Sequence, residues 1–179
     1  ESVIAGIVEG RVEQGIVRGE AVENLDTLPL PDLRLVHGFD RLWSGPEAKS
    51  LHAYPLVTSR GCPYGCRYCS VSALFGRRIR YRSAERVAED VGHLRRMGYR
   101  RLFFYDDNFT ADRQRTLAIQ TCLTDLDLAW TAQVRLDFHW LDPADRRQCD
   151  HLLLEQMRRS GGDMLLVGYE TIEEETARQ

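Results

Sequence analysis

The chain reads Thr58-Ser59-Arg60-Gly61-Cys62-Pro63-Tyr64-Gly65-Cys66-Arg67-Tyr68-Cys69 where an apolar, β-rich run ends and a loop begins. Its three cysteines follow the spacing C-x3-C-x2-C. Glycine permits positive φ angles and proline presets a turn, so this loop can curl until the three thiols converge. Open and closed α/β sheets alike place their ligand sites in loops at the carboxyl ends of strands. The stretch therefore predicts an α/β fold with a thiol-lined site at the rim of its sheet.

Outward from this loop, apolar runs alternate with stretches whose apolar residues recur at helical spacing. We predict strands over residues 55–59, 102–105, 130–137 and 164–169. The third strand alternates polar and apolar residues, so one of its faces needs a wet or ligand-filled lumen. Strands that alternate with helices over short connections form a parallel sheet with right-handed crossovers. An eight-unit barrel uses roughly 31 residues per unit, so the residues from 55 onward supply about four units.

Three helices are expected between these strands. The first follows Ser83, a good N-cap, and carries one apolar stripe of Val87, Val91 and Leu94. The second carries a stripe of Ile119, Cys122, Leu123 and Leu126. The third begins with Asp142 as N-cap and Pro143 as first residue, and its inner stripe is Cys149, Leu152, Leu153 and Met157. Cys122 and Cys149 are accordingly interpreted as buried small hydrophobic residues.

Composition limits the class of protein. The chain has 179 residues, of which 43% are hydrophobic and 28% charged, with a formal net charge of -3. No apolar run approaches the roughly 18 residues of a membrane span, and no signal peptide is visible. We therefore predict a cytoplasmic protein with no membrane partner, and the charge gives no reason to expect a nucleic-acid partner.

The chain is interpreted as a fragment, because it begins at Glu1 without methionine and stops in a charged segment. Residues 1–50 are broken by glycines and prolines and are predicted to be an irregular linker. Residues 51–179 are predicted to be the N-terminal part of a truncated barrel domain.

Five cysteines, an odd number in a reducing compartment, favour metal binding or burial over a disulfide framework. A structural zinc site and an electron-transfer cluster each need four protein ligands. Cys122 and Cys149 are poor fourth ligands because they lie on apolar helical stripes, and His52 precedes the first strand. Three thiolates on a four-iron cluster would leave one iron open to a cofactor, whereas structural zinc is the alternative interpretation.

The cysteine loop resembles that of the radical S-adenosylmethionine (SAM) superfamily. The wider pattern resembles the branch that carries an N-terminal cobalamin-binding domain. The matching stretches are 58–71, 74–78, 81–83, Asp106-Asp107-Asn108-Phe109, Ala132-Gln133-Val134-Arg135, 157–161 and Gly168-Tyr169-Glu170, and the connector 25–32. The resemblance implies a partial radical SAM barrel of the (β/α)6 type, TIM-like in form, with the linker leading from a cobalamin-binding domain outside these residues.

The resemblance also assigns roles to individual residues. Cys62, Cys66 and Cys69 would hold a [4Fe-4S] cluster whose open iron is chelated by SAM, and Tyr68 would flank the adenine. Asp106 and Asp107 would hold the SAM amino group, although an Asx turn that caps the second helix is the alternative.

Two further residues are assigned in the same way. Arg135 would pair with the SAM carboxylate or with substrate, unless it forms an ion pair with Asp137 or Glu170. Glu170 would approach the SAM ribose, with a solvated strand end as the alternative. The basic cluster from Arg77 to Arg82 is interpreted as a solvated face rather than an anion site.

The implied activity is reductive cleavage of SAM to a 5'-deoxyadenosyl radical, for cobalamin-dependent methyl transfer or rearrangement of an unknown small molecule. Reduction needs a strong one-electron donor such as flavodoxin or ferredoxin. A tRNA methylthiotransferase is the second hypothesis, and a non-catalytic iron-sulfur or zinc module is the third. With about four of six units present, the fragment is expected to be inactive by itself.

Overall fold

The computed structural model describes residues 6, 8–10, 21–39, 46, 49, 52–142 and 144–169. Half of the predicted linker, residues 1–50, therefore lies outside the described residues, as do Pro143 and Glu170. No helix in the described part of the chain is both long and apolar enough to span a membrane.

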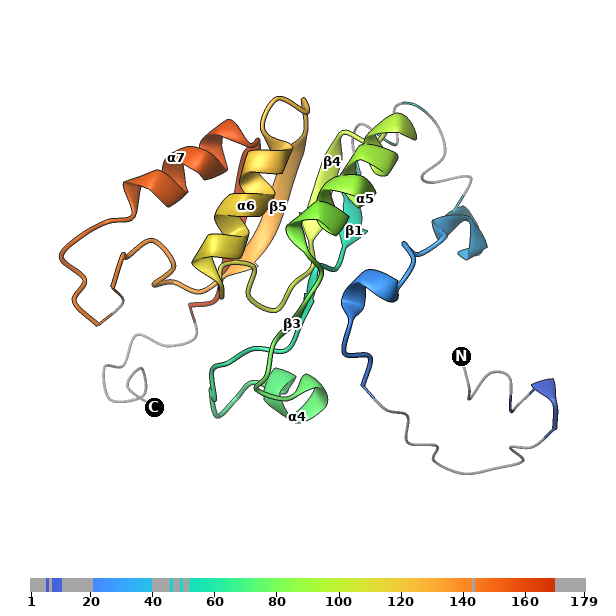
Figure 1. The fold of residues 1–179 in the computed structure, drawn as a ribbon, viewed down its shortest axis with the longest axis horizontal. Coiled ribbons are helices and arrows are strands. Elements are labelled where there is room, and N and C mark those ends of the chain that lie inside the picture. Colours follow the sequence, from blue (N-terminus) through green and yellow to red (C-terminus); the bar gives the residue numbers. More distant parts are fainter. Residues whose placement is uncertain are drawn as a thin grey trace.

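A four-stranded parallel sheet forms the centre of the molecule. Its strands are β1 (Tyr54–Leu56), β4 (Arg101–Phe104), β5 (Ala129–Val134) and β6 (Gly162–Val167), and they lie side by side in that order. The helices α5 (Ala84–Arg96), α6 (Arg113–Leu123) and α7 (His151–Arg159) form one layer over one face of the sheet (Figure 1). Consecutive parallel strands joined through helices on one face are the βαβ pattern. The predicted α/β fold is thus confirmed.

The core lies between the helices and the sheet. Ser83 caps α5 by accepting a hydrogen bond from the Arg86 backbone N–H at 3.0 Å, as expected. Phe104 is buried between Phe109, stacked at 4.6 Å, and Trp130, edge-on at 5.8 Å between ring centroids. Aromatic pairs of this geometry add about 0.5–1.5 kcal/mol beyond their buried area. They join the end of β4 to the start of β5 within the core.

The predicted third helix is wrong at its start. Asp142 accepts a hydrogen bond from the Ala144 backbone N–H at 2.8 Å, which makes a local turn. Trp140 and Cys149 then form an isolated β-bridge. The helix α7 begins only at His151, after its N-cap Asp150, whose carboxylate accepts from the Leu153 N–H at 3.1 Å. Cys149 therefore precedes the helix and is not part of its inner stripe.

The second helix is rotated relative to the expected stripe. Its buried residues are Thr116, Ile119, Gln120 and Leu123, whereas Cys122 is exposed. The interpretation of Cys122 as a buried hydrophobic residue is therefore wrong. The third strand ends at Val134, three residues before its predicted end, and Leu136 is exposed.

The outer strand β6 is the most exposed strand of the sheet. Met164, Leu166 and Val167 keep 51%, 41% and 38% of their surface. Within the described residues β6 pairs with β5 alone, so its other edge carries no strand. This matches the expectation of a barrel that is not closed by these residues.

A small antiparallel pair stands apart from the main sheet. It consists of β2 (Ser59–Arg60) and β3 (Arg80–Tyr81), with the short helix α4 (Val71–Phe75) between them. Residues 61–79, which we call the cysteine loop, are thus closed at their base by a two-strand clasp. The sequence does not predict this clasp, because two-residue strands leave no periodic signal.

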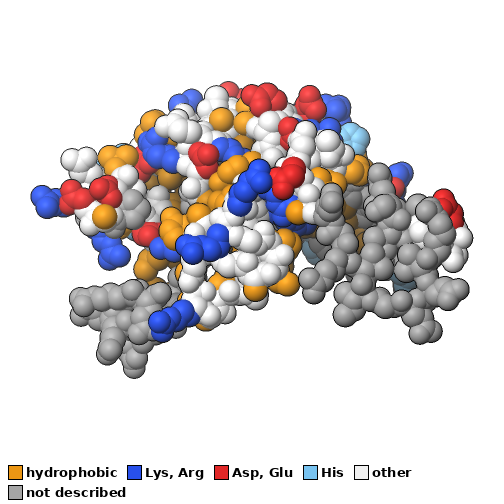
Figure 2. Space-filling view, turned by 60° about the horizontal axis from the view of Figure 1, so that its bottom comes forward, with side chains coloured by type: hydrophobic (Ala, Val, Ile, Leu, Met, Phe, Trp, Pro, Cys, Tyr) orange, Lys and Arg blue, Asp and Glu red, His pale blue; other side chains and the backbone are white. Residues whose placement is uncertain are grey.

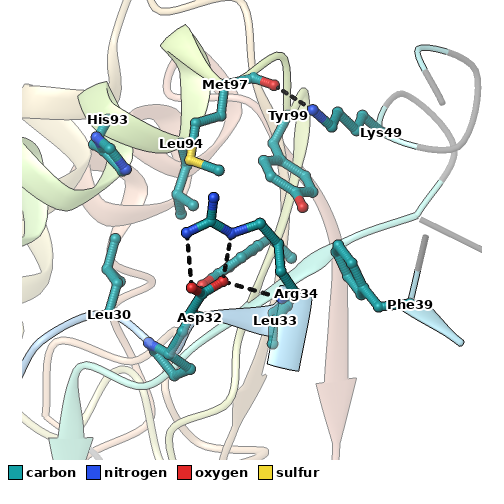
Figure 3. Close-up of a pocket in the computed structure, with 12 residues that line it drawn as sticks. Leu30, Asp32, Leu33, Arg34, Phe39, Lys49, His93, Leu94, Met97 and Tyr99 are labelled. Atoms are coloured by element: carbon teal, nitrogen blue, oxygen red, sulfur yellow. Dashed lines mark hydrogen bonds and ion pairs between the residues drawn. The ribbon is translucent and has the colours of Figure 1, made fainter. Parts of the chain in front are cut away.

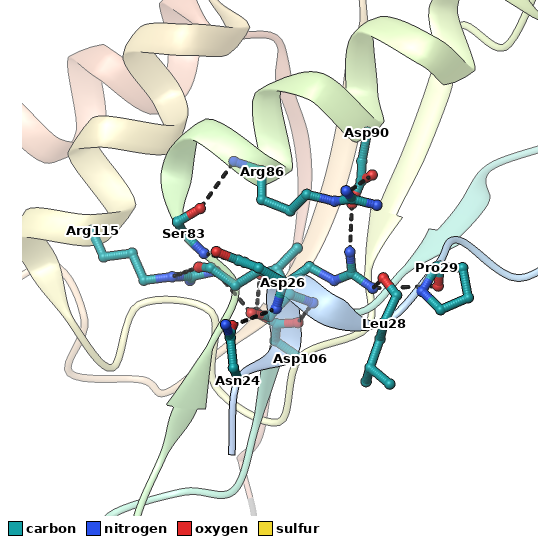
Figure 4. A network of polar contacts seen from close by, with 11 residues as sticks. Asn24, Asp26, Leu28, Pro29, Ser83, Arg86, Asp90, Asp106 and Arg115 are labelled. Atoms are coloured by element: carbon teal, nitrogen blue, oxygen red, sulfur yellow. Dashed lines mark hydrogen bonds and ion pairs between the residues drawn. The ribbon is translucent and has the colours of Figure 1, made fainter. Parts of the chain in front are cut away.

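The segment before the barrel packs against it through polar contacts (Figure 4). It contains two short 3-10 turns, η1 (Leu25–Thr27) and η2 (Leu33–Leu35). The Asp26 carboxylate accepts from the Ser83 backbone N–H at 2.8 Å. Arg82 donates to the Leu28 carbonyl at 2.9 Å and, from its other terminal nitrogen, to Asp90 at 2.8 Å. Residues 26–28 are therefore held by Arg82 and Ser83, directly before the helix α5.

Candidate functional site

The cysteine loop lies beyond the carboxyl end of β1, where the sequence predicts a ligand site, and it projects with α4 away from the helix layer (Figure 1). Its backbone is folded on itself. The Cys69 N–H donates to the Cys66 carbonyl at 3.1 Å. Ser72 at the start of α4 donates from its hydroxyl to the Tyr64 carbonyl at 3.0 Å. Cys66 and Cys69 therefore share one turn, and α4 supports the loop that carries all three cysteines.

Gly61 is the hinge at which the chain enters this loop. Its φ angle is +95°, which side chains rarely allow, and a Cβ there would lie 2.8 Å from the Arg78 carbonyl oxygen. The two sides of the loop base approach each other at this point. Only glycine fits both the backbone angle and the close approach.

All three thiols are free and partly buried. Burial raises the pKa of the Cys62 thiol, the neighbouring Cys66 and Cys69 thiols raise it further, and Arg135 opposes the rise. Each of these groups therefore lies near Cys62. A thiol with a raised pKa stays protonated at neutral pH, and binding a metal ion releases its proton. The loop thus offers three soft sulfur donors. A bound metal centre would balance the negative charge of their thiolate forms.

No group of three His, Cys, Asp or Glu side chains in the described part of the chain is arranged to hold a metal ion. The comparison of two kinds of centre therefore rests on the chemistry of the donor set. A mononuclear zinc needs its ligands to converge on one point, whereas a cubane cluster takes each thiolate on a different iron. Cys122 and Cys149 lie on α6 and before α7, outside the cysteine loop. The donor set fits a three-thiolate cluster better than a structural zinc.

Arg135, directly after β5, reaches the cysteine loop. Its guanidinium carbon lies 3.7 Å from the centroid of the Tyr64 ring. Two hydrogen bonds of 2.9 Å join it to the Asp137 carboxylate, which raises the pKa of Arg135 and lowers that of Asp137. The predicted ion pair with Asp137 is therefore present, and Tyr64 of the cysteine loop contacts a charged side chain that follows β5. The sequence assigns Tyr64 no role, and only the fold reveals this contact.

Asp107 also lies beside the cysteine loop. Burial raises the pKa of its carboxyl, while the Gly61 backbone and the Arg60 charge oppose that rise. The predicted carboxylate therefore does meet the loop entrance at the rim. Its position suits a contact with a cationic group placed next to the cysteines.

Asp106 has a different position from the one predicted. Its carboxylate is fully buried and accepts from the Thr58 N–H at 2.6 Å, the Thr58 hydroxyl at 2.5 Å and the Ser59 N–H at 3.0 Å. With both oxygens bonded inside the protein, this side chain is not placed to hold the SAM amino group. The alternative of a helix cap is wrong as well, because Asp112 caps α6.

Tyr68 stands at the surface of the cysteine loop with 69% of its area exposed, which leaves its ring accessible for stacking. Hydrophobic and basic side chains lie next to one another on the face shown in Figure 2. The predicted ribose contact, Glu170, lies outside the described residues.

A cavity of about 260 Å³ lies at the other end of β1 (Figure 3). Tyr54, Tyr99 and the paired side chains of Asp32 and Arg34 line it, and Lys49 donates to the Met97 carbonyl nearby at 2.9 Å. None of its lining residues belongs to the cysteine loop. It is therefore separate from the candidate site.

Comparison with known proteins is consistent with this geometry. The family described as the radical SAM superfamily matches residues 56–179. An uncharacterized methyltransferase of Pyrococcus horikoshii is 35% identical over 132 residues, which cover 70% of this chain and 28% of that protein. The bacteriochlorophyllide d C-12(1)-methyltransferase of Chlorobaculum tepidum is 23% identical over 176 residues, 96% of this chain and 35% of that protein. The chain thus spans about a third or less of these relatives.

Two solved structures have a similar fold. The cobalamin-dependent SAM radical enzyme OxsB superimposes with a TM-score of 0.56 at 18% identity, over 74% of this chain and 20% of that one. The radical SAM methyltransferase TsrM from Kitasatospora setae, with tryptophan and a SAM analogue bound, gives 0.59 at 16% identity, over 71% and 23%. Both likenesses concern the fold, and they place this sheet and its helices in a radical SAM architecture.

Proposed function

The chain belongs to the radical SAM superfamily, and on that premise we propose that Cys62, Cys66 and Cys69 hold a [4Fe-4S] cluster used for the reductive cleavage of SAM. The observation that carries the proposal is the placement of three free thiols in one loop beyond the carboxyl end of β1. When bound, such a cluster supplies the electron that breaks SAM into methionine and a 5'-deoxyadenosyl radical. The chemistry needs an external low-potential donor, for which a flavodoxin or ferredoxin is our proposal.

The residues around the loop have distinct tasks in this proposal. Asp107 offers a carboxylate at the loop entrance to the ammonium group of SAM. Arg135 supports the loop through the Tyr64 ring and, because Asp137 occupies one edge of its guanidinium, presents its remaining donors to a carboxylate. Tyr68 offers an exposed ring to the adenine. Glu170 stays a proposed ribose contact from the resemblance alone.

The finer proposal is cobalamin-dependent methyl transfer to a small molecule. Two relatives are named as methyltransferases, and OxsB, whose fold is similar, is a cobalamin-dependent enzyme. Cobalamin would be bound by a domain outside residues 1–179, which the connector 25–32 would join to the barrel. These resemblances favour methyl transfer over the methylthiotransferase hypothesis.

Anaerobic reconstitution of the full-length protein tests the proposal. With dithionite and SAM, we expect 5'-deoxyadenosine, and with added cob(I)alamin, which accepts the methyl group of SAM, also S-adenosylhomocysteine, by liquid chromatography and mass spectrometry. About four irons and four sulfides per chain, with an EPR signal that SAM alters, would support the cluster. One zinc and no iron, or no product from SAM in either assay, would contradict it.

A further inference from the structure

The carboxylate of Asp106 accepts hydrogen bonds from the chain directly beyond the point where the hydrogen bonds of the parallel sheet end. The last bond between β1 and the end of β4 is from the Tyr105 N–H to the Leu56 carbonyl at 2.9 Å. Directly after it, the Asp106 carboxylate receives both the N–H and the hydroxyl of Thr58, and the N–H of Ser59. A carboxylate that accepts three bonds out of contact with water holds its donors more firmly than a neutral acceptor would. The chain is thus fixed four residues before Cys62.

Arg115 of α6 holds the same segment from the carbonyl side (Figure 4). It donates to the Thr58 carbonyl at 2.9 Å and to the Arg82 carbonyl at 3.1 Å. Its guanidinium carbon lies 4.7 Å from the centroid of the Tyr81 ring. The Arg82 N–H in turn donates to the Thr58 carbonyl at 2.8 Å. One arginine therefore joins the residue before β2 to the residue after β3, across the base of the cysteine loop.

We infer that Asp106 and Arg115 are positioning residues that lock the base of the cysteine loop and so fix where its three thiols stand. Asp106, after the end of β4, accepts from the N–H of Thr58, and Arg115, on α6, donates to the C=O of Thr58. The two side chains carry opposite charges and come from different elements. The lock acts on the loop through the clasp of β2 and β3, and neither side chain has to touch SAM. Insofar as it concerns the cluster, the inference rests on the proposed function.

The substitution Asp106→Asn tests the lock with little change of shape. The amide retains one oxygen but turns a donor toward the Thr58 hydroxyl, and it removes the negative charge. The matched control is Asp150→Asn, which changes another buried carboxylate that accepts from Arg113 and from the first turn of α7. Both variants lose one buried charge, but only the first lies at the loop base.

Hydrogen exchange of the full-length protein without metal measures the lock directly. In Asp106→Asn we expect amides in peptides covering residues 58–82 to exchange at least about tenfold faster, with peptides of α7 unchanged. Asp150→Asn should show the reverse pattern. Equal exchange of residues 58–82 in wild type and Asp106→Asn would overturn the inference, as would equal acceleration there by Asp150→Asn.

Reconstitution then separates positioning from SAM binding. We expect Asp106→Asn to retain less than half of the wild-type iron after desalting and to change the EPR signal of the reduced cluster without SAM. Wild-type iron and an unchanged signal, with only SAM affinity reduced, would make Asp106 a SAM ligand and overturn the inference. If wild type itself takes up no cluster, the proposed function fails, while the exchange experiment still decides the lock.

A second pair of variants guards against a failure of Asp106→Asn to fold. Thr58→Ser keeps the hydroxyl donor to Asp106, whereas Thr58→Val removes it at nearly equal volume. We expect wild-type exchange and iron content in the serine variant, and faster exchange with lower iron content in the valine variant. Identical behaviour of the two variants would contradict a role for this bond.

Discussion

At its base the cysteine loop is held by Thr58 and Asp106, both fully buried, whereas near its tip Tyr68 and Leu74 keep 69% and 71% of their surface. The base has a charged or polar partner for each buried group described above, and the tip carries the thiols and exposed rings. Buried, bonded groups resist change, and exposed groups tolerate it. The contrast indicates that the two ends of the loop have different roles, so that changes at the base should affect local stability and, through it, the position of the thiols, whereas changes at the tip should affect the cluster directly.

The largest effect is expected at the tip, from Cys69→Ala. Removal of one of three thiolates should abolish the cluster and SAM cleavage together, measured as iron content and 5'-deoxyadenosine. The metal-free protein should keep its stability within about 0.5 kcal/mol, because Cys69 is only partly buried on a loop. Cys122→Ala, an exposed cysteine on α6, is the control and should retain iron. Normal iron content in Cys69→Ala would assign the cluster elsewhere.

The largest loss of stability is expected next to the base, from Arg82→Met. Arg82 and Asp90 form an ion pair at 2.8 Å with 6% and 4% of their side chains exposed. Loss of Arg82 leaves the buried Asp90 carboxylate with Arg86 as its remaining partner, at 3.1 Å, so the cost should lie near the lower end of the roughly 3–5 kcal/mol of a broken buried pair. Urea denaturation measures this change. The double variant Arg82→Met with Asp90→Leu should recover part of it, and a loss below about 1 kcal/mol in the single variant would show that the pair is not essential.

A smaller loss is expected from Gly61→Ala, where base and tip meet. A Cβ at 2.8 Å from the Arg78 carbonyl, on a residue with φ of +95°, should cost about 2–4 kcal/mol from backbone strain and overpacking combined. Gly76→Ala is the matched control, because Gly76 has φ of +81° but nothing within 4 Å of its Cβ position. The difference between the two denaturation curves isolates the close contact, and equal curves would refute it.

The smallest effect concerns Asp137→Asn, beneath the tip. Arg135 lowers the pKa of Asp137 below its ordinary 3.8, so the ionised form stabilises the fold above about pH 4. That contribution is lost as the pH falls through the lowered pKa. For a partly exposed pair we expect about 0.5–1 kcal/mol at pH 7.

Denaturation at several pH values checks this expectation. The wild-type and Asp137→Asn proteins should converge in stability as the pH falls from about 4 through the lowered pKa of Asp137. The exposed carboxylate of Asp145, which pairs with Arg147, supplies the control, and Asp145→Asn should change little at any pH. A gap that persists at low pH would mean that the asparagine acts through packing rather than charge.

The sequence allowed the sheet and the first helix to be predicted because their signals are local. Ser83 is followed by an apolar stripe, and all of Val87, Val91 and Leu94 are buried as expected. Asp142-Pro143 carries the same kind of local signal, yet the bridge of Trp140 to Cys149 delays the helix until after Asp150. A capping pattern shows where a helix can start, and tertiary pairing decides whether it does.

The candidate site likewise combines a feature that local sequence predicts with contacts that only the folded chain forms. The cysteine triplet is contiguous, so its position at the strand end could be predicted. Asp106 was expected at the rim beside Asp107. Its carboxylate instead binds Thr58, a buried residue that lies 48 residues earlier in the chain. Likewise nothing adjacent in sequence places Arg135 over the Tyr64 ring. Contacts across such separations depend on the register of β1, β4 and β5, which only the folded sheet supplies.

The exposed strand β6 has a practical consequence for handling residues 1–179 alone. Within the described residues its outer edge offers unpaired backbone groups next to the exposed side chains of Met164, Leu166 and Val167. Such an edge is a template on which another copy can add a strand. Expressed in isolation, the chain should therefore self-associate as its concentration rises, and a charged substitution such as Leu166→Lys should improve its solubility.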